Sequence, residues 1–426
     1  MRMNKNKAIV PKLRFPEFSN SYWGITRLNT LADKITKRNK DDNIGKVFTN
    51  SATEGVVDQE EYFDRGIANK HNLTNYFVVE KGDYVYNPRI SNTAPVGPIS
   101  KNKLGIGVMS PLYTIFRFRN KENDFYEHFF HTNLWHAYIK SLSNTGARHD
   151  RITISVDDFM KMPLPYTSPG EQQKIADCLF SIDELIDAES RKLKVLEKYK
   201  KGLIQKLFPE KGKTIPEWRF PEFRGYEEWK LQKLKQVCDF QEGYAFSSNN
   251  FEVNNTDSNH IQVVRITDIN NKNSNADKVF VNMDLIRNND LYRYLISKND
   301  LVLSLTGAAG FNFFMWDTNI AVLNQRTLKI IPKNEKNHAI KFLIEPLIYK
   351  EINMHGTGQN NNLSKEVLKN VEIVLPISYK EQQKIADCLS EIDIMITEQS
   401  NKVKQLKAHK KGLMQGLFPS FEEADV

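Results

Sequence analysis

The chain has 426 residues, of which 40% are hydrophobic and 26% are charged. This length and composition indicate a globular protein of two or three domains and exclude a disordered or fibrous chain. Its 60 Lys and Arg residues against 52 Asp and Glu residues give a net charge of +8. Such an excess suits a polyanionic partner, and it is also ordinary for a basic protein that has none.

Cysteine usage and hydropathy narrow the class of protein further. The three cysteines form no CxxC or Cys/His cluster, so the sequence predicts reduced thiols and no metal site. No apolar run reaches the length of about 18 residues that a membrane span needs, and the N-terminus lacks the apolar centre of a signal peptide. We therefore expect a cytoplasmic protein.

The two halves of the chain begin and end alike. The segment RFPEF occurs at 14–18 and again at 219–223. Near the end of each half, 145–165 and 357–376 run from a Thr-Gly loop through a predicted short helix to an apolar strand that ends in Leu-Pro. This pattern indicates two modules that do one kind of job on two targets. A duplication that has simply drifted is the alternative.

The interiors of the halves share one further landmark. Segments 76–89 and 294–307 can be aligned, and each predicts two short strands around a turn. Gly82 and Asn299 occupy equivalent places in the two turns, and both residue types adopt positive φ readily. The sequence therefore predicts positive φ at both positions.

Strand and helix patterns alternate along each half. Apolar runs rich in β-formers predict strands at 112–118 and 327–331, and longer mixed runs predict helices at 124–142 and 338–353. Together with long polar loops, these elements predict an α/β (mixed α+β) fold for each of two globular domains.

The most specific repeat is a long helix at the end of each half. EQQKIADCL occupies 171–179 and recurs at 381–389, and both copies continue to KKGL and LFP segments. Apolar residues in both copies are spaced alternately by three and four residues over five heptads, which predicts a coiled-coil seam. The predicted seam residues are Ile175, Leu179, Ile182, Ile186, Leu193, Leu196, Leu203, Ile385, Leu389, Ile392, Ile396, Val403, Leu406 and Leu413.

Both helices are expected to begin with a capping box. Ser168 is followed three residues later by Glu171, and Ser378 is followed in the same way by Glu381. Pro169 suits the first helical position of the first copy. The local sequence thus predicts where each helix begins.

Charge predicts how the two helices pair. In each copy the first half is acidic and the second half is basic. An antiparallel pair sets each acidic half against a basic half, whereas a parallel pair sets like charges together. The same gradient suits the dipole of each helix, so it supports antiparallel pairing without deciding it. Paired in this way, the helices are expected to form a rod that separates the two domains.

The chain resembles the specificity subunit (HsdS) of a type I restriction-modification system over nearly its whole length. The resemblance rests on the two RFPEF segments, the two EQQKIA stretches that follow Leu-Pro, and the two helices that end in KKGL and LFP. It implies the following parts: target-recognition domain 1 at 1–166, spacer helix 1 at 167–209, target-recognition domain 2 at 210–377, spacer helix 2 at 378–419 and a C-terminal tail at 420–426.

The resemblance also implies a function. Each recognition domain is expected to read one half of a bipartite target in double-stranded DNA, while the paired helices set the unread gap and dock two methyltransferase subunits. Restriction-translocase subunits are expected to join that complex. The resemblance implies no catalysis by this chain and no cofactor on it, with S-adenosylmethionine, ATP and Mg expected on the partner subunits.

The motif search agrees with a non-catalytic role. The chain has neither a convincing adenine-methyltransferase motif nor a GxxxxGK[ST] phosphate loop. Two alternatives stay open from sequence alone. One is a self-contained restriction or modification enzyme with a cryptic active site, and the other is a purely structural coiled-coil adaptor.

Candidate DNA contacts are polar side chains and glycine-containing loops beside predicted strands, because Arg, Lys, Asn, Gln, Ser and Thr bind base edges and phosphates. In the first domain they are Lys37, Arg38, Asn87, Arg89, Ser91, Asn92, Gly146, Arg148 and Arg151. In the second domain they are Arg265, Thr267, Ser304, Thr306, Asn324, Gln325, Arg326, Gly358, Gln359, Asn360, Asn361 and Asn362.

The two Thr-Gly loops differ in composition, and this predicts different bases. Arginines at 148–151 favour guanine contacts in one half-site, whereas Gln and Asn residues at 359–362 favour adenine contacts in the other. We expect the half-site centres to lie about one DNA turn apart, roughly 34 to 36 Å, so that both domains face the same side of the duplex.

Overall fold

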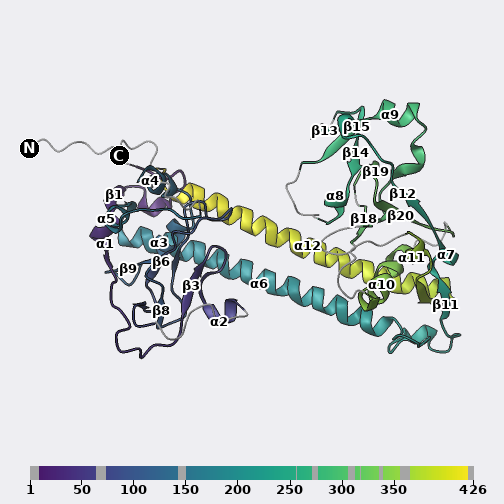
Figure 1. The fold of residues 1–426 in the computed structure, drawn as a ribbon, viewed down its shortest axis with the longest axis horizontal. Coiled ribbons are helices and arrows are strands. Elements are labelled where there is room, and N and C mark those ends of the chain that lie inside the picture. Colours follow the sequence, from purple (N-terminus) through teal and green to yellow (C-terminus); the bar gives the residue numbers. More distant parts are fainter. Residues whose placement is uncertain are drawn as a thin grey trace, which may run out of the picture. The chain divides into compact units, whose positions relative to one another are not determined.

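The computed structural model of the protein describes residues 9–63, 73–142, 150–255, 257–270, 277–305, 312–316, 318–334, 339–355 and 365–420. The chain divides into two compact units: unit 1 holds Met1–Ser190 and Asn401–Val426, and unit 2 holds Arg191–Ser400. The division falls inside both long helices, α6 (Pro169–Leu207) and α12 (Tyr379–Leu417), which Figure 1 shows in teal and yellow. Each unit therefore contains one half of each helix and is described separately.

Unit 1 is built on a four-stranded antiparallel sheet with the strand order β2-β9-β6-β7. Two further strand pairs are β3 with β4 and β5 with β8, and a parallel bridge between Val47 and Val108 links them. A third pair is β1 with β10. The strands are β1 Gly24–Arg27, β2 Ala32–Lys34, β3 Phe48–Ser51, β4 Gly55–Asp58, β5 Phe77–Val79, β6 Tyr84–Tyr86, β7 Ile99–Lys101, β8 Gly107–Met109, β9 Thr114–Phe118 and β10 Pro163–Tyr166.

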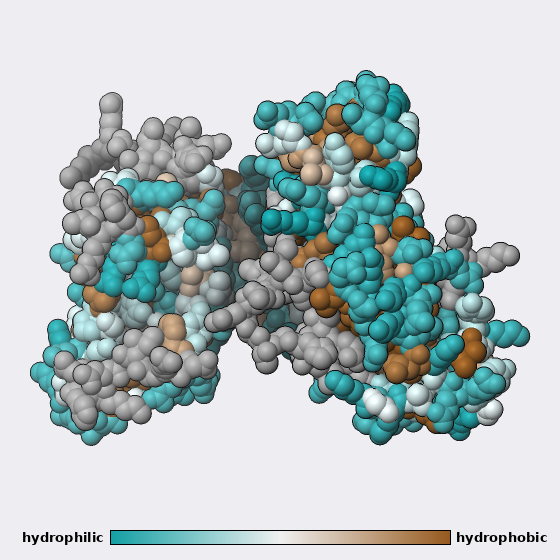
Figure 2. All heavy atoms as spheres, turned by 45° about the vertical axis from the view of Figure 1, so that its right-hand side comes forward, coloured by the Kyte–Doolittle hydropathy of each residue, from teal (hydrophilic) through white to brown (hydrophobic). Residues whose placement is uncertain are grey.

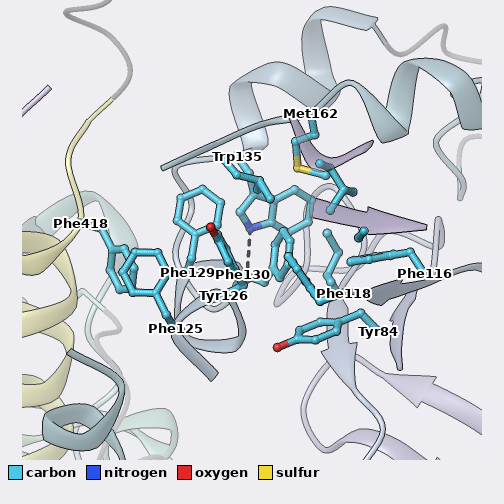
Figure 3. Close-up of a cluster of buried hydrophobic side chains, with 14 of the residues drawn as sticks. Tyr84, Phe116, Phe118, Phe125, Tyr126, Phe129, Phe130, Trp135, Met162 and Phe418 are labelled. Atoms are coloured by element: carbon cyan, nitrogen blue, oxygen red, sulfur yellow. Dashed lines mark hydrogen bonds between the residues drawn. The ribbon is translucent and has the colours of Figure 1, made fainter. Parts of the chain in front are cut away.

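The prediction of one helix over 124–142 was wrong. Two helices occupy this range, and residues 131–135 separate them. The Trp135 indole N–H donates to the carbonyl of Phe130, the last residue of the first helix, at 3.1 Å (Figure 3). A side-chain donor thus satisfies a carbonyl that the ended helix leaves free. The short helices of unit 1 are α1 Leu28–Leu31, α2 Gln59–Tyr62, α3 Asp124–Phe130, α4 His136–Leu142 and α5 Val156–Met160.

Unit 2 contains a four-stranded antiparallel sheet with the order β12-β20-β17-β18 and a five-stranded sheet with the order β13-β15-β14-β19-β16. In the second sheet β14 and β19 are parallel neighbours. A separate pair is β11 with β21. The strands are β11 Lys230–Lys233, β12 Cys238–Glu242, β13 Glu252–Val253, β14 His260–Val264, β15 Val279–Asn282, β16 Leu295–Ile296, β17 Leu301–Ser304, β18 Phe313–Met315, β19 Ala321–Leu323, β20 Thr327–Pro332 and β21 Glu372–Leu375.

Several predicted elements of both units are confirmed. The strands expected at 112–118 and 327–331 are β9 and β20, and the helix expected at 338–353 is α10. The helices of unit 2 are α7 Leu234–Val237, α8 Ile266–Asn270, α9 Met283–Asn288, α10 Ala339–His355 and α11 Lys365–Lys369.

The strand order of unit 1 recurs in unit 2. The sheet β2-β9-β6-β7 corresponds to β12-β20-β17-β18, and the bridge from Val47 to Val108 corresponds to the parallel neighbours β14 and β19. The pair β1 and β10, immediately before α6, corresponds to β11 and β21 before α12. The two halves therefore share their scaffold even where their sequences differ.

The predicted turns with positive φ are confirmed. Gly82 has a φ of 95° and Asn299 a φ of 71°. The aspartate that follows each of them, Asp83 or Asp300, accepts a hydrogen bond from the backbone N–H three residues before it, at 2.7 Å and 2.9 Å. The same short polar side chain thus closes the same turn in both units.

Each unit has its own core, and the end of one long helix belongs to it. In unit 1 the ring of Phe418, directly after α12, lies 5.1 Å from that of Phe125 within an aromatic cluster (Figure 3). In unit 2 Phe208, directly after α6, lies 6.1 Å from Trp229, ring to ring. The aromatic residue of each LFP segment therefore anchors a helix end in a core.

Ion pairs show how the helix halves run in unit 1. The Lys410 ammonium of α12 lies 2.6 Å from the Asp183 carboxylate of α6, and Lys402 lies 2.5 Å from Glu189. Rising residue numbers on α6 meet falling numbers on α12. The two halves therefore run in opposite directions in this unit.

The predicted seam positions face inward along both helices. All fourteen predicted seam residues are buried or half-buried, whereas Val195 and Tyr199 between them are 65% and 59% exposed. Lys200 and Lys410 stand at positions of the seam where the spacing would place an apolar residue, and both meet the opposite helix. In unit 2 the Lys200 ammonium lies 2.6 Å from Asp393, just as Lys410 meets Asp183 in unit 1.

The capping boxes were predicted wrongly for the glutamates, which were expected to accept a hydrogen bond from the backbone N–H of Ser168 and of Ser378. The Glu171 carboxylate accepts hydrogen bonds from the Arg14 guanidinium at 2.8 and 3.0 Å rather than from the backbone of Ser168. In unit 2 the Glu381 carboxylate accepts from Arg219 at 2.7 Å through both oxygens. The glutamate of each EQQKIA repeat thus binds the arginine of the RFPEF repeat in its own unit.

Candidate nucleic-acid interface

In unit 1, two predicted DNA-binding loops lie side by side. Backbone hydrogen bonds of 3.0 Å join residues 88–90 to residues 150–152. Arg89 and Arg151 face each other across this bridge. Tertiary structure therefore places two arginines together that are 62 residues apart in the chain.

The two guanidinium groups remain available for a ligand. The Asp150 carboxylate lies 4.0 Å from Arg89 and 3.8 Å from Arg151, and the three side chains are 53%, 62% and 28% exposed. Exposed ion pairs at such distances contribute little to stability because water screens them. A phosphate or a guanine edge can therefore replace the carboxylate as the partner of these arginines.

Two other residues of this loop that were predicted to contact DNA, Asn87 and Ser91, form hydrogen bonds within the chain. The Asn87 side chain donates to the Asn50 carbonyl at 2.9 Å and accepts from the Arg89 backbone N–H at 3.0 Å. The Ser91 hydroxyl accepts from the Ala94 N–H at 3.1 Å. Asn87 and Ser91 thus fix the conformation of the loop. Asn92 is exposed, and its side chain offers an NH2 group as donor and a carbonyl oxygen as acceptor.

Lys37 and Arg38 are exposed beside β5. The Lys37 carbonyl accepts a hydrogen bond from the Val78 N–H at 2.8 Å, which fixes the backbone there. The Arg38 guanidinium lies 5.4 Å over the Phe77 ring and donates to the Asn75 carbonyl at 3.0 Å. Stacking on an aromatic ring holds a guanidinium in a defined orientation and leaves it charged.

In unit 2 three predicted DNA contacts, Asn324, Gln325 and Arg326, lie in the turn between β19 and β20. Residues Asn324–Thr327 form the turn, which is closed by the Thr327 N–H and the Asn324 carbonyl at 3.2 Å. The Asn324 N–H donates to Val264 at the end of β14, and the Leu305 N–H, just after β17, donates to Arg326. Gln325 and Arg326 are exposed at this meeting point of three strand ends.

One predicted contact in unit 2 requires correction, and two others have contacts within the chain. Ser304 is fully buried and its hydroxyl accepts from the Asn312 N–H at 3.2 Å, so a DNA contact by Ser304 was predicted wrongly. The Arg265 guanidinium is bound to Asp268 at 3.1 Å and to the Asp277 carbonyl at 2.7 Å, and its contact with DNA stays a prediction. Asn324 has its side-chain oxygen buried, whereas Thr267 is exposed on α8.

The remaining predicted contacts lie outside the described residues. They are Gly146, Arg148, Thr306, Gly358, Gln359, Asn360, Asn361 and Asn362. The hypothesis of guanine and adenine preferences for the two Thr-Gly loops therefore stays a prediction.

Sequence reasoning missed one exposed turn in unit 1. Ser110–Tyr113 is closed by the Tyr113 N–H and the Ser110 carbonyl at 3.0 Å, and it leads into β9 as Asn324–Thr327 leads into β20. Its Ser-Pro pair at the first two positions is a turn signal that could have located it.

On the face drawn in Figure 2, hydrophobic side chains lie in small groups among hydrophilic ones. Within the described ranges, no helix has the length and apolarity that a membrane crossing requires. No group of three or more His, Cys, Asp or Glu side chains in the described part of the chain is placed to hold a metal ion.

Comparison with known proteins places these features in a family. Residues 226–408 match the type I restriction modification DNA specificity domain. Over 375 residues the chain is 28% identical to the type I restriction enzyme MjaVIII specificity subunit of Methanocaldococcus jannaschii, covering 83% of each protein. Both comparisons thus make the chain similar to type I restriction-modification specificity subunits. DNA recognition is the role of a specificity subunit in such a system.

Solved structures have the same fold as this chain. A type I restriction-modification S subunit from M. genitalium superposes with a TM-score of 0.57 at 14% identity, covering 96% of this chain and 99% of that one. A structure solved to explain the complex assembly and conformational transition of the type I R-M system gives a TM-score of 0.52 at 15% identity. The match covers 93% of this chain and 97% of that one. At these identities the likeness concerns the fold.

Proposed function

We propose that unit 1 and unit 2 each read one half of a bipartite target in duplex DNA. The recurrence of one strand order with different loop sequences in both units carries this proposal. Arg89 and Arg151 in unit 1, and Arg326 in unit 2, supply guanidinium donors suited to guanine edges and phosphates. One scaffold with two sets of loops suits two readers of different half-sites.

We further propose that α6 and α12 are the two copies of a duplicated spacer and pair as one antiparallel coiled coil. Ion pairs between opposite charges within each unit support this pairing. The recognition domains are then 1–166 and 210–377, and the spacer helices are 167–209 and 378–419, followed by the tail at 420–426. The helices set the unread gap, with half-site centres about one DNA turn apart.

The helices also dock two methyltransferase subunits, and restriction-translocase subunits join that complex. The chain has no catalysis of its own, and S-adenosylmethionine, ATP and Mg bind to the partners. It acts in the cytoplasm. The alternative of a self-contained enzyme receives no support from the similarity of this chain to a specificity subunit over 83% of its length.

The test is to map the methylated motif of a complex reconstituted from this chain and its methyltransferase subunits. The wild-type chain should give a bipartite motif. Arg89→Ala should relax base preference in one half of the motif and Arg326→Ala in the other, each by about 1 to 3 kcal/mol of discrimination at one position.

Lys81→Ala is the matched control, because Lys81 is an exposed cation at the opposite end of β6 from Arg89. It should leave the motif unchanged. Methyl transfer by the isolated chain, or a single change that relaxes both halves of the motif, would contradict the proposed function.

A further inference from the structure

Equivalent turns precede β9 in unit 1 and β20 in unit 2. Ser110–Tyr113 follows β8, and Asn324–Thr327 follows β19. In both turns the N–H of the fourth residue donates to the carbonyl of the first, at 3.0 and 3.2 Å. Because β8 and β19 hold matching places in the sheets, as do β9 and β20, the two turns correspond residue for residue.

The third residue of the turn differs in chemistry between the units. It is Leu112 in unit 1, where its side chain is 58% exposed, and Arg326 in unit 2, which is also exposed. Arg326 has a φ of 63°, a left-handed conformation that side chains of this kind rarely adopt. Strained backbone conformations cluster at functional sites, so this strain favours a ligand contact for Arg326. Leu112 is not among the described residues with positive φ, and its case rests on its exposure and on the turn that carries it.

Leu112 is presented on a turn that is fixed before any ligand binds. Pro111 at the second position restricts the backbone to the φ that the turn requires. The Ser110 hydroxyl accepts a hydrogen bond from the Leu112 N–H at 3.4 Å. An apolar side chain on a rigid turn loses little conformational entropy when it makes a contact.

Hydrogen bonds connect this turn to the loop that carries Arg89. The Tyr113 hydroxyl is 2.9 Å from the hydroxyl of Thr49 on β3. The next residue, Asn50, accepts through its carbonyl from the Asn87 side chain at 2.9 Å. Asn87 in turn fixes the Arg89 backbone. Because β6 and β9 pair with Tyr86 opposite Thr114, Leu112 lies just beyond the end of β6 that leads to Arg89.

We propose that Leu112 contacts the C5-methyl group of a thymine in the half-site read by unit 1. This inference rests on the proposed DNA-reading function. A leucine side chain neither donates nor accepts a hydrogen bond, and the thymine methyl is the apolar feature that a base edge offers in the major groove. Arg326, at the same place in unit 2, suits a guanine edge instead. One turn position thus selects different bases in the two units.

The experiment measures DNA binding by the complex reconstituted with the methyltransferase subunits. Once the Arg89→Ala variant has shown which half-site unit 1 reads, each thymine there is replaced in turn by deoxyuridine, which lacks only the methyl group. At one position the wild-type complex should bind about fourfold more weakly, the factor expected for one buried methyl group. The Leu112→Ala complex should bind both duplexes equally.

Leu104→Ala is the matched control. Leu104 is 49% exposed and its N–H is bound by Asn102, whose carbonyl accepts from Gly82 at the opposite end of β6. This variant should keep the full sensitivity to deoxyuridine. A half-site without thymine, or equal binding of all duplexes by the wild-type complex, would overturn the role of Leu112 while leaving the proposed function intact. If the wild-type complex binds all DNA sequences equally well, the proposed function itself is overturned.

Discussion

Glu171 is a buried carboxylate that joins the start of α6 to the beginning of unit 1. Its side chain is 1% exposed, and it accepts hydrogen bonds from Arg14 and, at 2.6 Å, from the Thr167 hydroxyl. Burial alone raises the pKa of a carboxyl group, but these hydrogen bonds outweigh burial and hold the pKa of Glu171 below its ordinary value. The folded state therefore stabilises the ionised form of the Glu171 carboxyl group.

Glu171→Gln should lower the free energy of unfolding by about 1.5 to 3 kcal/mol at neutral pH, the range for hydrogen bonds to a charged group. Because the folded pKa is depressed, this contribution is present above the ordinary carboxyl pKa of about 4.3 and disappears as the pH falls through the folded value. The difference between wild type and variant should thus shrink on acidification. Urea denaturation at a series of pH values measures it.

Glu17→Gln serves as the control for this prediction. Glu17 is 50% exposed and lies 3.6 Å from Lys174, so its loss should change stability by less than about 1 kcal/mol. If the two glutamine variants unfold alike at neutral pH, the buried pair has no special role.

Residue-level prediction succeeded where the cause is local. Gly82 and Asn299 were assigned positive φ because those residue types and their neighbours decide a turn. Glu171 was misassigned because its partner, Arg14, lies 157 residues away. The pairing of Arg89 with Arg151 escaped prediction for the same reason, since a β-bridge between two loops leaves no local pattern.

At the scale of elements, the two long helices were the most predictable part of the chain. Heptad spacing and a charge gradient extend over many residues, so single exceptions do not hide them. The break between α3 and α4 was missed although its cause is local, because the Trp135 indole lies only five residues beyond the Phe130 carbonyl that it binds. Ser304 was misjudged because a polar side chain at a strand end looks the same in sequence whether it is buried or exposed.

The ion pair between Lys410 and Asp183 tests the opposed direction of the helix halves in unit 1. Asp183→Lys would set two ammonium groups together, so it should destabilise the chain by about 1 kcal/mol. Adding Lys410→Asp should restore most of that loss, because it recreates the pair with reversed charges. A double-mutant cycle of unfolding free energies measures the coupling.

The same cycle with Asp187→Lys in place of Asp183→Lys provides the control. Asp187 is exposed on α6, one turn further along, so Lys410→Asp should not rescue that change. Equal rescue of both lysine variants would show that net charge, not helix pairing, produces the effect.

For the whole molecule, the proposed spacer role makes the gap in the DNA target depend on helix length. The units divide at Ser190 in α6 and at Ser400 in α12, equivalent positions of the repeat. Inserting one heptad after each of these residues keeps the apolar seam in phase. Seven helical residues add about 10 Å, or roughly three base pairs at 3.4 Å each. The mapped methylation motif should keep both half-sites and widen its gap by about three base pairs.

Insertion of two residues at the same two places is the control, because it adds about 3 Å but rotates the following part of each helix by about 200°, which turns the seam out of phase. We expect this variant to lose methylation, since the apolar positions of the two helices no longer meet. A heptad variant that methylates the original motif with its original gap would show that α6 and α12 serve only to dock the partner subunits. The spacing between half-sites would then be set by the partners and not by this chain.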